Sequence, residues 1–346
     1  MRRKEYNIKL KTIGPVHIGS GNTKTRNEYL HEYNRGKLHL FHASQFMELI
    51  IEKGLIDAYE QFILYESGKT YFFDWLRTHK ILEAVKQLAY LTVDIGARQQ
   101  INQVQECLKT AKYEPYIPGS SIKGALRTCI LAKVLGGKSY DSIFDKFMQT
   151  PDIKQLQKDI NRIITDVEIN SAMRSLVISD SRPLAKDDLV ICQKIDDSLY
   201  QRARQRGKTL LPIYREAIGS DKTLEFHMTI KDNALFDLEY IKVAVTEFYA
   251  AIAENLLTNF GIAQRSGQPI YIGGGSGYIS KTLIYNLTDH DRAVKVISRI
   301  LAKKFNKHNH NQDTGLDLSP RTLKITELEG REYEMGLCYI SFEETP

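Results

Sequence analysis

The sequence predicts an α+β fold, because short strand-like runs alternate with amphipathic helical segments along its 346 residues. Residues 224–230 alternate apolar and polar side chains without interruption, which is typical of a strand with one buried face. Residues 120–135 instead place Ile122, Leu126 and Ile130 on one helical face. A hydrophobic content of 42% and a charged content of 26% are those of an ordinary globular chain.

The first half opens with a strand and then becomes irregular. Residues 6–13 alternate in polarity and are expected to form a half-buried strand. Ser44 is expected to cap a helix that ends at Gly54. Residues 55–112 look mostly helical, and we interpret them as a helical insertion in the first domain. The other strands expected in this half are short apolar runs at residues 38–40, 176–179 and 189–192.

The second half repeats the alternation of strands and helices. Residues 210–217 and 224–230 are expected to pair with each other as strands. A long helix is expected over residues 235–257, where apolar residues recur at the spacing of one helical face. Further helices are expected at residues 278–287 and 292–305. Further strands are expected at residues 269–272, 323–326 and 337–340. A chain of this length is expected to form two domains, at residues 1–208 and 209–346.

Charge and cysteine usage limit the possible partners and compartments. The net charge of +6 and the isoelectric point of about 8.9 are compatible with an RNA partner. The four cysteines are too scattered to form a metal knuckle or a redox pair, which favours reduced thiols in a cytoplasmic protein. No apolar run is long enough to cross a bilayer or to act as a signal peptide, so no membrane partner is expected.

The most informative motif is the run Tyr-Ile-Pro-Gly-Ser-Ser-Ile-Lys-Gly-Ala-Leu-Arg in the middle of the chain. Ser120 or Ser121 is expected to cap the helix that begins here, and Gly119 allows another backbone to approach closely. A helix N-terminus offers unpaired N–H groups and partial positive charge, and Lys123 and Arg127 share one helical stripe. The motif therefore predicts a phosphate-binding site. The alternative is an ordinary capped core helix with two solvated cations.

The same motif does not fit a nucleotide-binding P-loop. The spacing of Gly119 and Gly124 is suitable, but Ala125 and Leu126 occupy the positions where a P-loop needs Lys followed by Ser or Thr. A nucleotide-using enzyme is therefore disfavoured, and no cofactor is expected. A nucleic-acid backbone phosphate requires only hydrogen-bond donors and positive charge.

Two further glycine–serine loops resemble this site. The loop after the first strand contains His17, Gly19, Ser20 and Gly21, and Lys24 follows closely. His17 is equally compatible with contacting RNA and with packing as a strand residue. The other loop lies between residues 269–272 and the segment that carries Lys281, and it comprises Gly273, Gly274, Gly275, Ser276 and Gly277. Because the central motif and the loop at residues 273–277 each separate a strand-like run from a helix start, the halves of the chain are interpreted as related.

The sequence carries no clear catalytic grouping. A metal or acid–base enzyme needs carboxylates or histidines at usable spacing. Asp289, His290 and Asp291 resemble a metal-binding pair, but no second histidine motif accompanies them, and a helix cap explains them better. We therefore expect neither a metal site nor a catalytic residue.

Together, these motifs resemble the RAMP superfamily of CRISPR proteins. The Gly-Pro-Val-His-Ile-Gly-Ser-Gly run, the central motif, the Gly-Gly-Gly-Ser-Gly run and the Ser-Pro-Arg-Thr run that contains Arg321 follow in the order that the family shows. The resemblance covers most of the chain and is strongest to the family of fifth subunits of type III-A Csm effector complexes. It implies two ferredoxin-like, RRM-type βαββαβ units, with the helical insertion in the first.

The resemblance also implies a function. We expect a non-catalytic subunit that binds CRISPR RNA (crRNA), caps the filament near the crRNA 3′ end, and supports crRNA maturation and antiviral defence. The implied partners are crRNA, the backbone RAMP subunit, the small helical subunit and host nucleases that trim the RNA. The three glycine loops would hold phosphates, and Lys123, Arg127, Lys281 and Arg321 would supply charge.

The resemblance leaves one catalytic alternative. In the related backbone subunit, an aspartate in the loop after the first strand cuts target RNA, whereas the corresponding residues 19–28 here contain no aspartate. Some relatives cut precursor RNA with a histidine near the first strand. A metal-independent endoribonuclease that uses His17 is therefore the alternative function.

Overall fold

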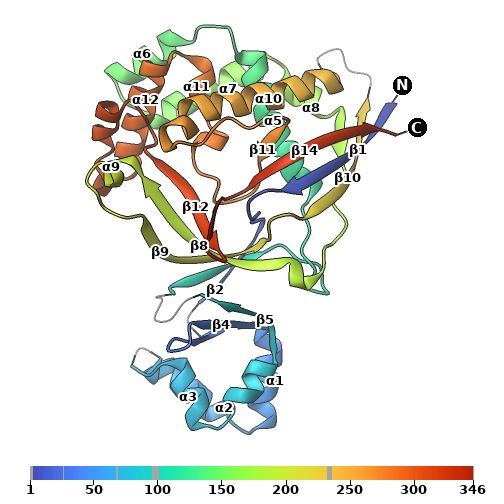
Figure 1. Cartoon of the computed structure of the whole chain (residues 1–346), viewed down its shortest axis with the longest axis vertical. Helices are drawn as coiled ribbons and strands as arrows, with labels where there is room; N and C mark the ends of the chain where they lie inside the picture. Colours follow the sequence, from blue (N-terminus) through green and yellow to red (C-terminus); the bar gives the residue numbers. More distant parts are fainter. Residues whose placement is uncertain (1–2, 26, 68, 96–100, 232–235, 346) are drawn as a thin grey trace.

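The computed structural model confirms the α+β class and describes residues 3–25, 27–67, 69–95, 101–231 and 236–345. Figure 1 shows a large body of sheets and helices above a smaller lobe. The body contains the main hydrophobic core, and the lobe has a smaller core of its own. The residues expected to bind RNA all lie in the body.

A five-stranded antiparallel sheet organises the body. Its strand order is β11-β14-β1-β10-β7, so the first strand of the chain lies at its centre. Tyr6, Ile8 and Leu10 of β1 are buried and alternate with more exposed residues, as their sequence pattern predicts. The strands are β1 (Arg3–Thr12), β7 (Leu176–Ile178), β10 (Thr223–Lys231), β11 (Pro269–Tyr271) and β14 (Leu337–Glu344).

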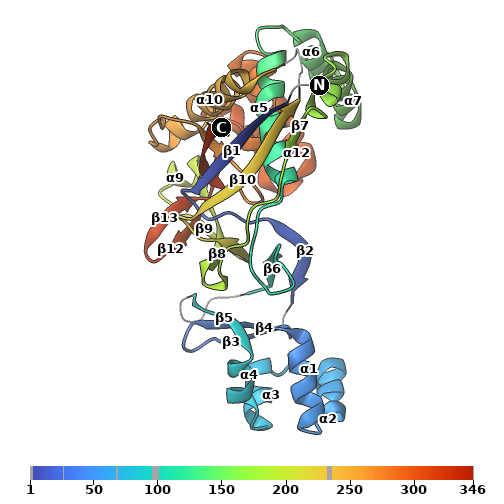
Figure 2. The same ribbon diagram turned by 90° about the vertical axis from the view of Figure 1, so that its right-hand side faces the viewer.

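This sheet contains one ferredoxin-like unit that spans almost the whole chain. The unit runs β1, α5 (Gly119–Leu135), β7, β10, α10 (Leu238–Asn255), β14, and its strands take the spatial order 4-1-3-2. Helices α5 and α10 pack against each other and share the core with the sheet (Figure 2). The long helix expected at residues 235–257 is therefore present, although residue 235 lies outside the described residues.

A six-stranded sheet lies between the first sheet and the lobe (Figure 1). Its order is β13-β12-β8-β9-β6-β2, and only the β6–β9 pair is parallel. Its connections include two hairpins, β8–β9 and β12–β13. The second βαββαβ unit that was expected is not confirmed, because the strands after residue 208 divide between this sheet and the first. The strands are β2 (Gly19–Lys24), β6 (Gln103–Cys107), β8 (Leu189–Ser198), β9 (Thr209–Ile218), β12 (Thr322–Leu328) and β13 (Arg331–Glu334).

Both sheets take strands from each side of the boundary predicted between residues 208 and 209. That boundary falls inside the β8–β9 hairpin. The prediction that residues 210–217 and 224–230 pair is wrong, because the turn between them carries the chain from one sheet to the other. Thr12 fixes this turn: its hydroxyl donates to the carbonyl of Gly219 at 2.7 Å and accepts from the N–H of Lys222 at 2.9 Å.

The lobe combines a three-stranded sheet with short helices. Buried aromatic side chains form much of the lobe core, whereas Tyr65 and Tyr71 are exposed, and the lobe sheet packs on β6, β8 and β9. The strands are β3 (Tyr29–Glu32), β4 (Lys37–Phe41) and β5 (Ala89–Asp94). The helices are α1 (Ala43–Glu52), α2 (Ile56–Gln61), α3 (Phe72–Thr78), α4 (Leu82–Gln87) and the π-helical turn η1 (Phe62–Glu66).

The helical insertion predicted at residues 55–112 therefore corresponds to only part of the lobe. Ile101, Val104 and Leu108 keep helical spacing, but residues 103–107 form strand β6. Val104 and Cys107 are buried there, and pairing with β9 and β2 outweighs the weak local preference for a helix.

The remaining helices cover the upper side of the body, apart from the short α9 beside the second sheet (Figure 1). Asp289 caps α12 by accepting a hydrogen bond from the N–H of Arg292 at 2.9 Å, which confirms a helix cap at this acidic motif. Within the described residues, no three His, Cys, Asp or Glu side chains group to hold a metal, and no helix has the length and apolar character needed to cross a bilayer. These helices are α6 (Asp141–Gln149), α7 (Ile153–Asp166), α8 (Ile169–Met173), α9 (Leu199–Arg202), α11 (Ile284–Leu287) and α12 (His290–Lys304).

Candidate nucleic-acid interface

Two of the three glycine loops lie against each other although they are far apart in the sequence. The backbone N–H of Gly274 donates to the carbonyl oxygen of His17 at 2.8 Å, and the two residues form an antiparallel bridge. A Cβ atom on Gly274 would lie 3.0 Å from Cδ2 of His17, and one on Gly19 would lie 3.2 Å from its Nε2. The imidazole ring is therefore enclosed by glycines of both loops, which form one continuous surface.

The third loop requires glycine for its conformation as well as for space. Gly273, Gly275 and Gly277 have φ values of +78°, +91° and +90°, which side-chain-bearing residues rarely adopt. A Cβ atom on Gly273 would also lie 2.3 Å from the carbonyl oxygen of His17. The backbone of this loop is partly exposed, and no Cβ atom shields it from a bound polymer.

Basic side chains from the second sheet adjoin this loop. A Cβ atom on Gly275 would lie 3.4 Å from a guanidinium nitrogen of Arg215, and one on Gly277 would lie 3.4 Å from Cγ of Lys324. Lys324 forms an ion pair with Asp196, whose carboxylate lies 2.8 Å from its ammonium group. The cluster, which we term the cation cluster, comprises Lys194 of β8, Arg215 of β9, Lys281 of the 3₁₀ turn η4 (Ile279–Lys281) and Lys324 of β12.

The members of the cation cluster repel one another, and this repulsion lowers the pKa values of two of its lysines. Burial lowers the pKa of Lys194; Asp196 opposes this, and the charges of Lys324 and Arg215 lower it further. Packing against protein atoms and the charge of Arg215 lower the pKa of Lys281, which stays exposed at the surface. A polyanion bound here would relieve this repulsion, so the cluster favours a phosphate chain.

The central motif lies elsewhere and its helix terminus is already occupied. The N–H of Gly119 donates to a carboxylate oxygen of Asp180 at 2.9 Å, and a Cβ atom on Gly119 would lie 2.1 Å from the carbonyl oxygen of Ile178. Lys123 donates to the carbonyl of Leu176 at 2.7 Å. The protein's own acid thus takes the place expected for a phosphate, and the glycine serves packing on β7.

The other polar residues of the central motif also make contacts within the chain. Arg127 donates to the side-chain oxygen of Asn170 at 3.0 Å, and the N–H of Ser121 donates to the carbonyl of Pro118 at 2.9 Å. Ser120 is exposed at the start of α5. The structure therefore brings together the first and third glycine loops but not the second.

Two basic residues expected to contact RNA are buried. Lys24 lies 3.2 Å from a carboxylate oxygen of Glu106 and donates to the carbonyl of Phe41 at 3.1 Å. Arg321 lies 3.0 Å from Asp313, and its guanidinium lies 4.6 Å from the ring centre of Tyr200. Both side chains pair with groups inside the protein and hold elements of the fold together. They therefore do not supply surface charge, contrary to the expectation from the sequence.

The loop serines are also partly satisfied within the protein. Ser20 donates to the carbonyl of Glu106 at 3.3 Å, and the buried Ser276 accepts from the hydroxyl of Ser280 at 2.9 Å. Gly21 is exposed and has a φ value of +91°. Lys281 does not open the long helix expected at residues 278–287, because the chain forms only the turn η4 and the short α11 there.

His17 is a buried, neutral imidazole at the centre of the interface. Its Nδ1 lies 2.6 Å from the carbonyl oxygen of Glu216, so Nδ1 must carry the proton and Nε2 is an acceptor. Burial is the largest effect on its pKa and lowers it. The ring is therefore a packed residue with one acceptor nitrogen directed toward Gly19.

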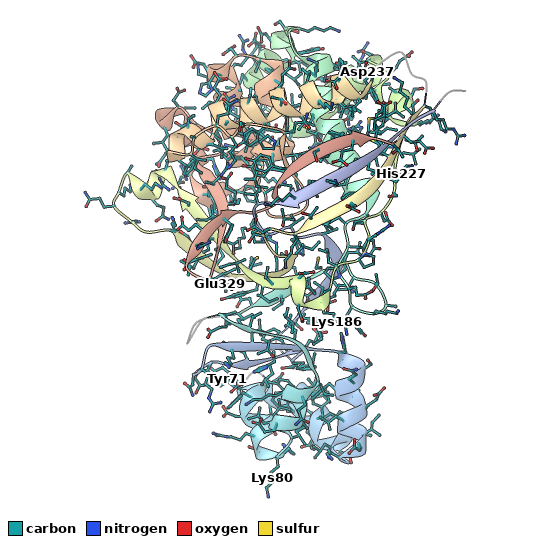
Figure 3. The ribbon with its side chains drawn as sticks, turned by 45° about the vertical axis from the view of Figure 1, so that its right-hand side comes forward. Tyr71, Lys80, Lys186, His227, Asp237 and Glu329 are labelled. Carbon is teal, nitrogen blue, oxygen red and sulfur yellow. The ribbon has the colours of Figure 1, made fainter. Side chains whose placement is uncertain are left out.

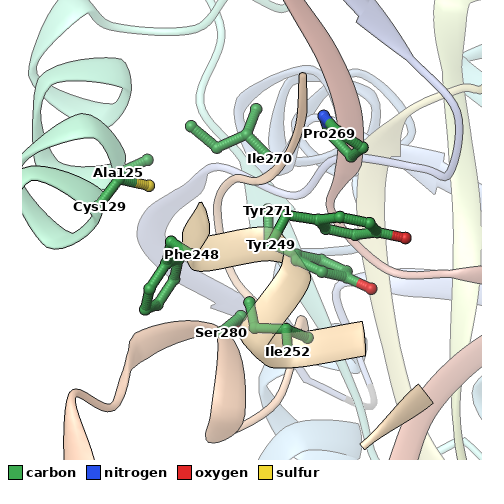
Figure 4. A pocket seen from close by; sticks show the side chains of 9 residues that line it. All are labelled: Ala125, Cys129, Phe248, Tyr249, Ile252, Pro269, Ile270, Tyr271 and Ser280. Atoms are coloured by element: carbon green, nitrogen blue, oxygen red, sulfur yellow. The ribbon is translucent and has the colours of Figure 1, made fainter. Parts of the chain in front are cut away.

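Neither of two further cavities suits a phosphate. The first, between α5, α10 and β11, is lined mainly by apolar side chains and has a volume of 10 Å³, about the room that one water needs (Figure 4). The second has a volume of 440 Å³ beside the β12–β13 hairpin. Its arginines, Arg202 and Arg265, pair with Asp197 and Glu334, so the second cavity offers little unpaired positive charge.

Sequence reasoning missed three members of the cation cluster: Lys194, Arg215 and Lys324. Each lies in a strand, where successive side chains point to opposite faces, so a cation between apolar residues is expected on the less buried face of the sheet. That signal identifies a candidate. The pairing of β12, β8 and β9 then shows that the three strands are neighbours, and Arg215 and Lys324 adjoin the third glycine loop.

Comparisons with known proteins agree with the architecture. The family model of the RAMP superfamily matches residues 9–280. The chain is 26% identical to the CRISPR system Cms protein Csm5 of Enterococcus italicus, over 99% of each chain. It is 24% identical to the Mycobacterium tuberculosis protein of the same name, over 98% of this chain and 97% of the relative.

Solved structures show the same fold. One similar chain belongs to a cryo-EM structure of a Csm-crRNA-target RNA ternary complex of a type III-A CRISPR-Cas system, with a TM-score of 0.66 and 19% identity over 97% of this chain and 100% of that chain. Another is the crystal structure of T. onnurineus Csm5, with a TM-score of 0.58 and 17% identity over 96% and 99% of the two chains.

Proposed function

The chain belongs to the RAMP superfamily, and we propose that it is a Csm5-type subunit of a type III-A CRISPR effector complex that holds crRNA without cutting it. In this proposal it caps the filament near the crRNA 3′ end and supports crRNA maturation and antiviral defence in the cytoplasm. Its partners are crRNA, the backbone RAMP subunit, the small helical subunit and host nucleases that trim the RNA.

One observation carries the proposal: two glycine loops from distant parts of the chain meet beside the cation cluster. Exposed backbone supplies hydrogen-bond donors, and the basic side chains supply positive charge. Such a surface suits a ribose-phosphate chain and carries no means of reading its sequence. It therefore suits a subunit that must bind guide RNAs of many sequences.

The acids near the interface support a binding role over a catalytic one. Glu28 is the acid of residues 19–28, and its carboxylate accepts from the N–H and the hydroxyl of Thr25 at 2.7 and 2.8 Å. Within the described part of the chain, no carboxylates and histidines group as a metal-dependent nuclease requires.

A salt titration of RNA binding tests the proposal. If the four members of the cation cluster contact phosphates of single-stranded RNA, the logarithm of the binding constant should fall with the logarithm of salt with a slope of about −3. Arg215→Gln and Lys281→Gln should each flatten that slope by about 0.7. Lys133→Gln is the matched control, because Lys133 lies on α5 and pairs with Glu247 at 2.9 Å. A flat salt response of the unmodified chain contradicts the proposal.

A metal-independent endoribonuclease remains the second candidate, because the acceptor nitrogen of His17 adjoins the glycine surface. Incubating the purified chain with crRNA precursor in a chelator distinguishes the two functions. A binding subunit leaves the RNA intact. Cleavage that His17→Ala abolishes would establish the nuclease and refute the binding-only proposal.

A further inference from the structure

Three aromatic rings form a stack where the lobe joins the body. The ring centres of His42 and Tyr90 lie 4.4 Å apart at an interplanar angle of 11°, and those of His42 and Tyr113 lie 3.6 Å apart at 24°. The two tyrosine rings are 6.0 Å apart. His42 therefore lies against both tyrosine rings, and each tyrosine has one face turned away from His42.

The stack is partly exposed, unlike the other aromatic cluster of the lobe. Its three rings are half-buried, whereas Phe62, Phe72 and Trp75 are at most 6% exposed in the lobe core. Tyr113 has a φ value of +65°, an uncommon conformation for a tyrosine. Its loop holds this conformation, because the Tyr113 N–H donates to the carbonyl of Thr110 at 2.9 Å.

The stack is continuous with the candidate RNA interface. Glu216 connects them: its backbone carbonyl binds the ring of His17, and its carboxylate accepts from the hydroxyl of Tyr90. The strand before the Tyr113 loop pairs with the first glycine loop, where Leu108 donates to the carbonyl of Ile18 at 2.6 Å. RNA lying over the first glycine loop would therefore pass close to these rings.

Lysines surround the rings. The ammonium groups of Lys109 and Lys186 lie 4.8 and 5.9 Å from the ring centres of Tyr90 and Tyr113. Lys186 is exposed and lies at the junction between body and lobe in Figure 3. Lys109 also pairs with Glu216, whereas Lys186 is the more exposed of the two cations and lies beside Tyr113.

We propose that this stack is a nucleobase site, in which an unpaired base of the bound RNA stacks on the outer face of Tyr113 while Lys186 contacts a neighbouring phosphate. The inference rests on the proposed function, because it extends the same RNA path. Tyr113 is the accessible end of the stack, since Lys109 and Glu216 occupy the surroundings of Tyr90. Stacking accepts any base, as a guide-binding subunit requires.

Two measurements on the full chain test the base site. First, single-stranded RNA is compared with an abasic ribose-phosphate oligomer of equal length, and the unmodified protein should bind the RNA more tightly. Second, RNA that contains 2-aminopurine should show quenched fluorescence on binding. Tyr113→Leu should lose the quenching and about 10-fold in affinity, and Tyr113→Phe should retain both.

A tyrosine elsewhere in the lobe supplies the matched control. Tyr71 is 66% exposed and stacks on Tyr33 with ring centres 5.5 Å apart, and Figure 3 shows it in the lobe, apart from Lys186 at the junction. Tyr71→Leu should leave affinity and quenching unchanged.

Three outcomes would overturn the inference. If RNA binds but Tyr113→Leu behaves as the unmodified protein, the base site fails and the proposed function stands. Equal affinity of the unmodified protein for RNA and for the abasic oligomer would also refute the base site and leave the proposed function standing. This comparison does not depend on whether Tyr113→Leu folds. If the unmodified chain binds no RNA at low salt, the proposed function fails and the base site with it.

Discussion

Replacing Glu216 with alanine is expected to destabilise the protein by about 3–5 kcal/mol, because it removes one partner of a buried ion pair. The side chain of Glu216 is completely buried, and that of its partner Lys109 is 10% exposed. The carboxylate also accepts hydrogen bonds from the hydroxyl of Tyr90 and, at 2.9 Å, from the N–H of Cys107. Alanine would leave an ammonium group and two further donors without this acceptor.

The loss is large because a folded domain is typically stable by only about 5–15 kcal/mol. Glu216→Gln should cost less than alanine, since the amide oxygen still accepts a hydrogen bond while the negative charge beside Lys109 is lost. An exposed ion pair offers the matched control. The side chain of Glu247 is 55% exposed and lies 2.9 Å from Lys133, so Glu247→Ala should cost less than about 1 kcal/mol.

Urea unfolding measures these differences with two probes. Circular dichroism follows the whole chain, and the fluorescence of Trp75, the single tryptophan, follows the core of the lobe. Because Glu216 joins the Tyr90 strand of the lobe to the body, both transitions should move to lower urea in Glu216→Ala. A loss for Glu216→Ala no greater than that for Glu247→Ala would refute the reasoning.

Three further predictions follow from single contacts. Gly273→Ala should lower both stability and RNA affinity, because its Cβ atom would lie 2.3 Å from a carbonyl oxygen at a φ of +78°. The control Gly330→Ala has a similar φ of +73° but open space around it, so it should lose only about 1 kcal/mol of stability from backbone strain. Urea unfolding and RNA titration of both variants check this. Asp180→Ala should cost about 1 kcal/mol by uncapping α5 and leave RNA affinity unchanged, and reduced RNA affinity in a folded variant would contradict the assignment of that terminus to packing. Burial, and then neighbouring lysines, lower the pKa of His42 from 6.5 to about 4. Between these two pH values the unfolded chain binds more protons than the folded chain, so the free energy of unfolding should fall as the pH decreases from 6.5 to about 4. The urea midpoint of His42→Gln should depend less steeply on pH there, and an unchanged dependence would show that this imidazole does not contribute.

The sequence indicated local features such as the glycine loops, but not which of these features lie together in the structure. The glycines around His17 and those of residues 273–277 were identified from their own neighbours. The central motif carries the same signals, yet Asp180, which fills its helix terminus, comes from another part of the chain. The sequence around Lys24 likewise suggests a surface cation, whereas the structure shows that Lys24 pairs with Glu106. Such partners are set by tertiary packing, which a local pattern does not contain.

The fold shows the same division between local pattern and long-range pairing. The alternation of residues 224–230 predicted β10 directly, because one face of that strand is buried. The same alternation does not say which strands lie beside it, so the halves were expected to form separate units. Residues 103–107 were misassigned because a short run fits both helical and extended spacing, and pairing with β9 decides between them.

The position of β1 has a consequence for synthesis of the chain. Tyr6 lies opposite Glu344, so β1 acquires one of its two neighbours only after the segment Leu337–Glu344 has been synthesised. A product that stops before Leu337 would expose the whole β14-facing edge of β1, and β11 would lose its pairing partner. Such fragments should aggregate or be degraded, because the central sheet is complete only when β14 has been made.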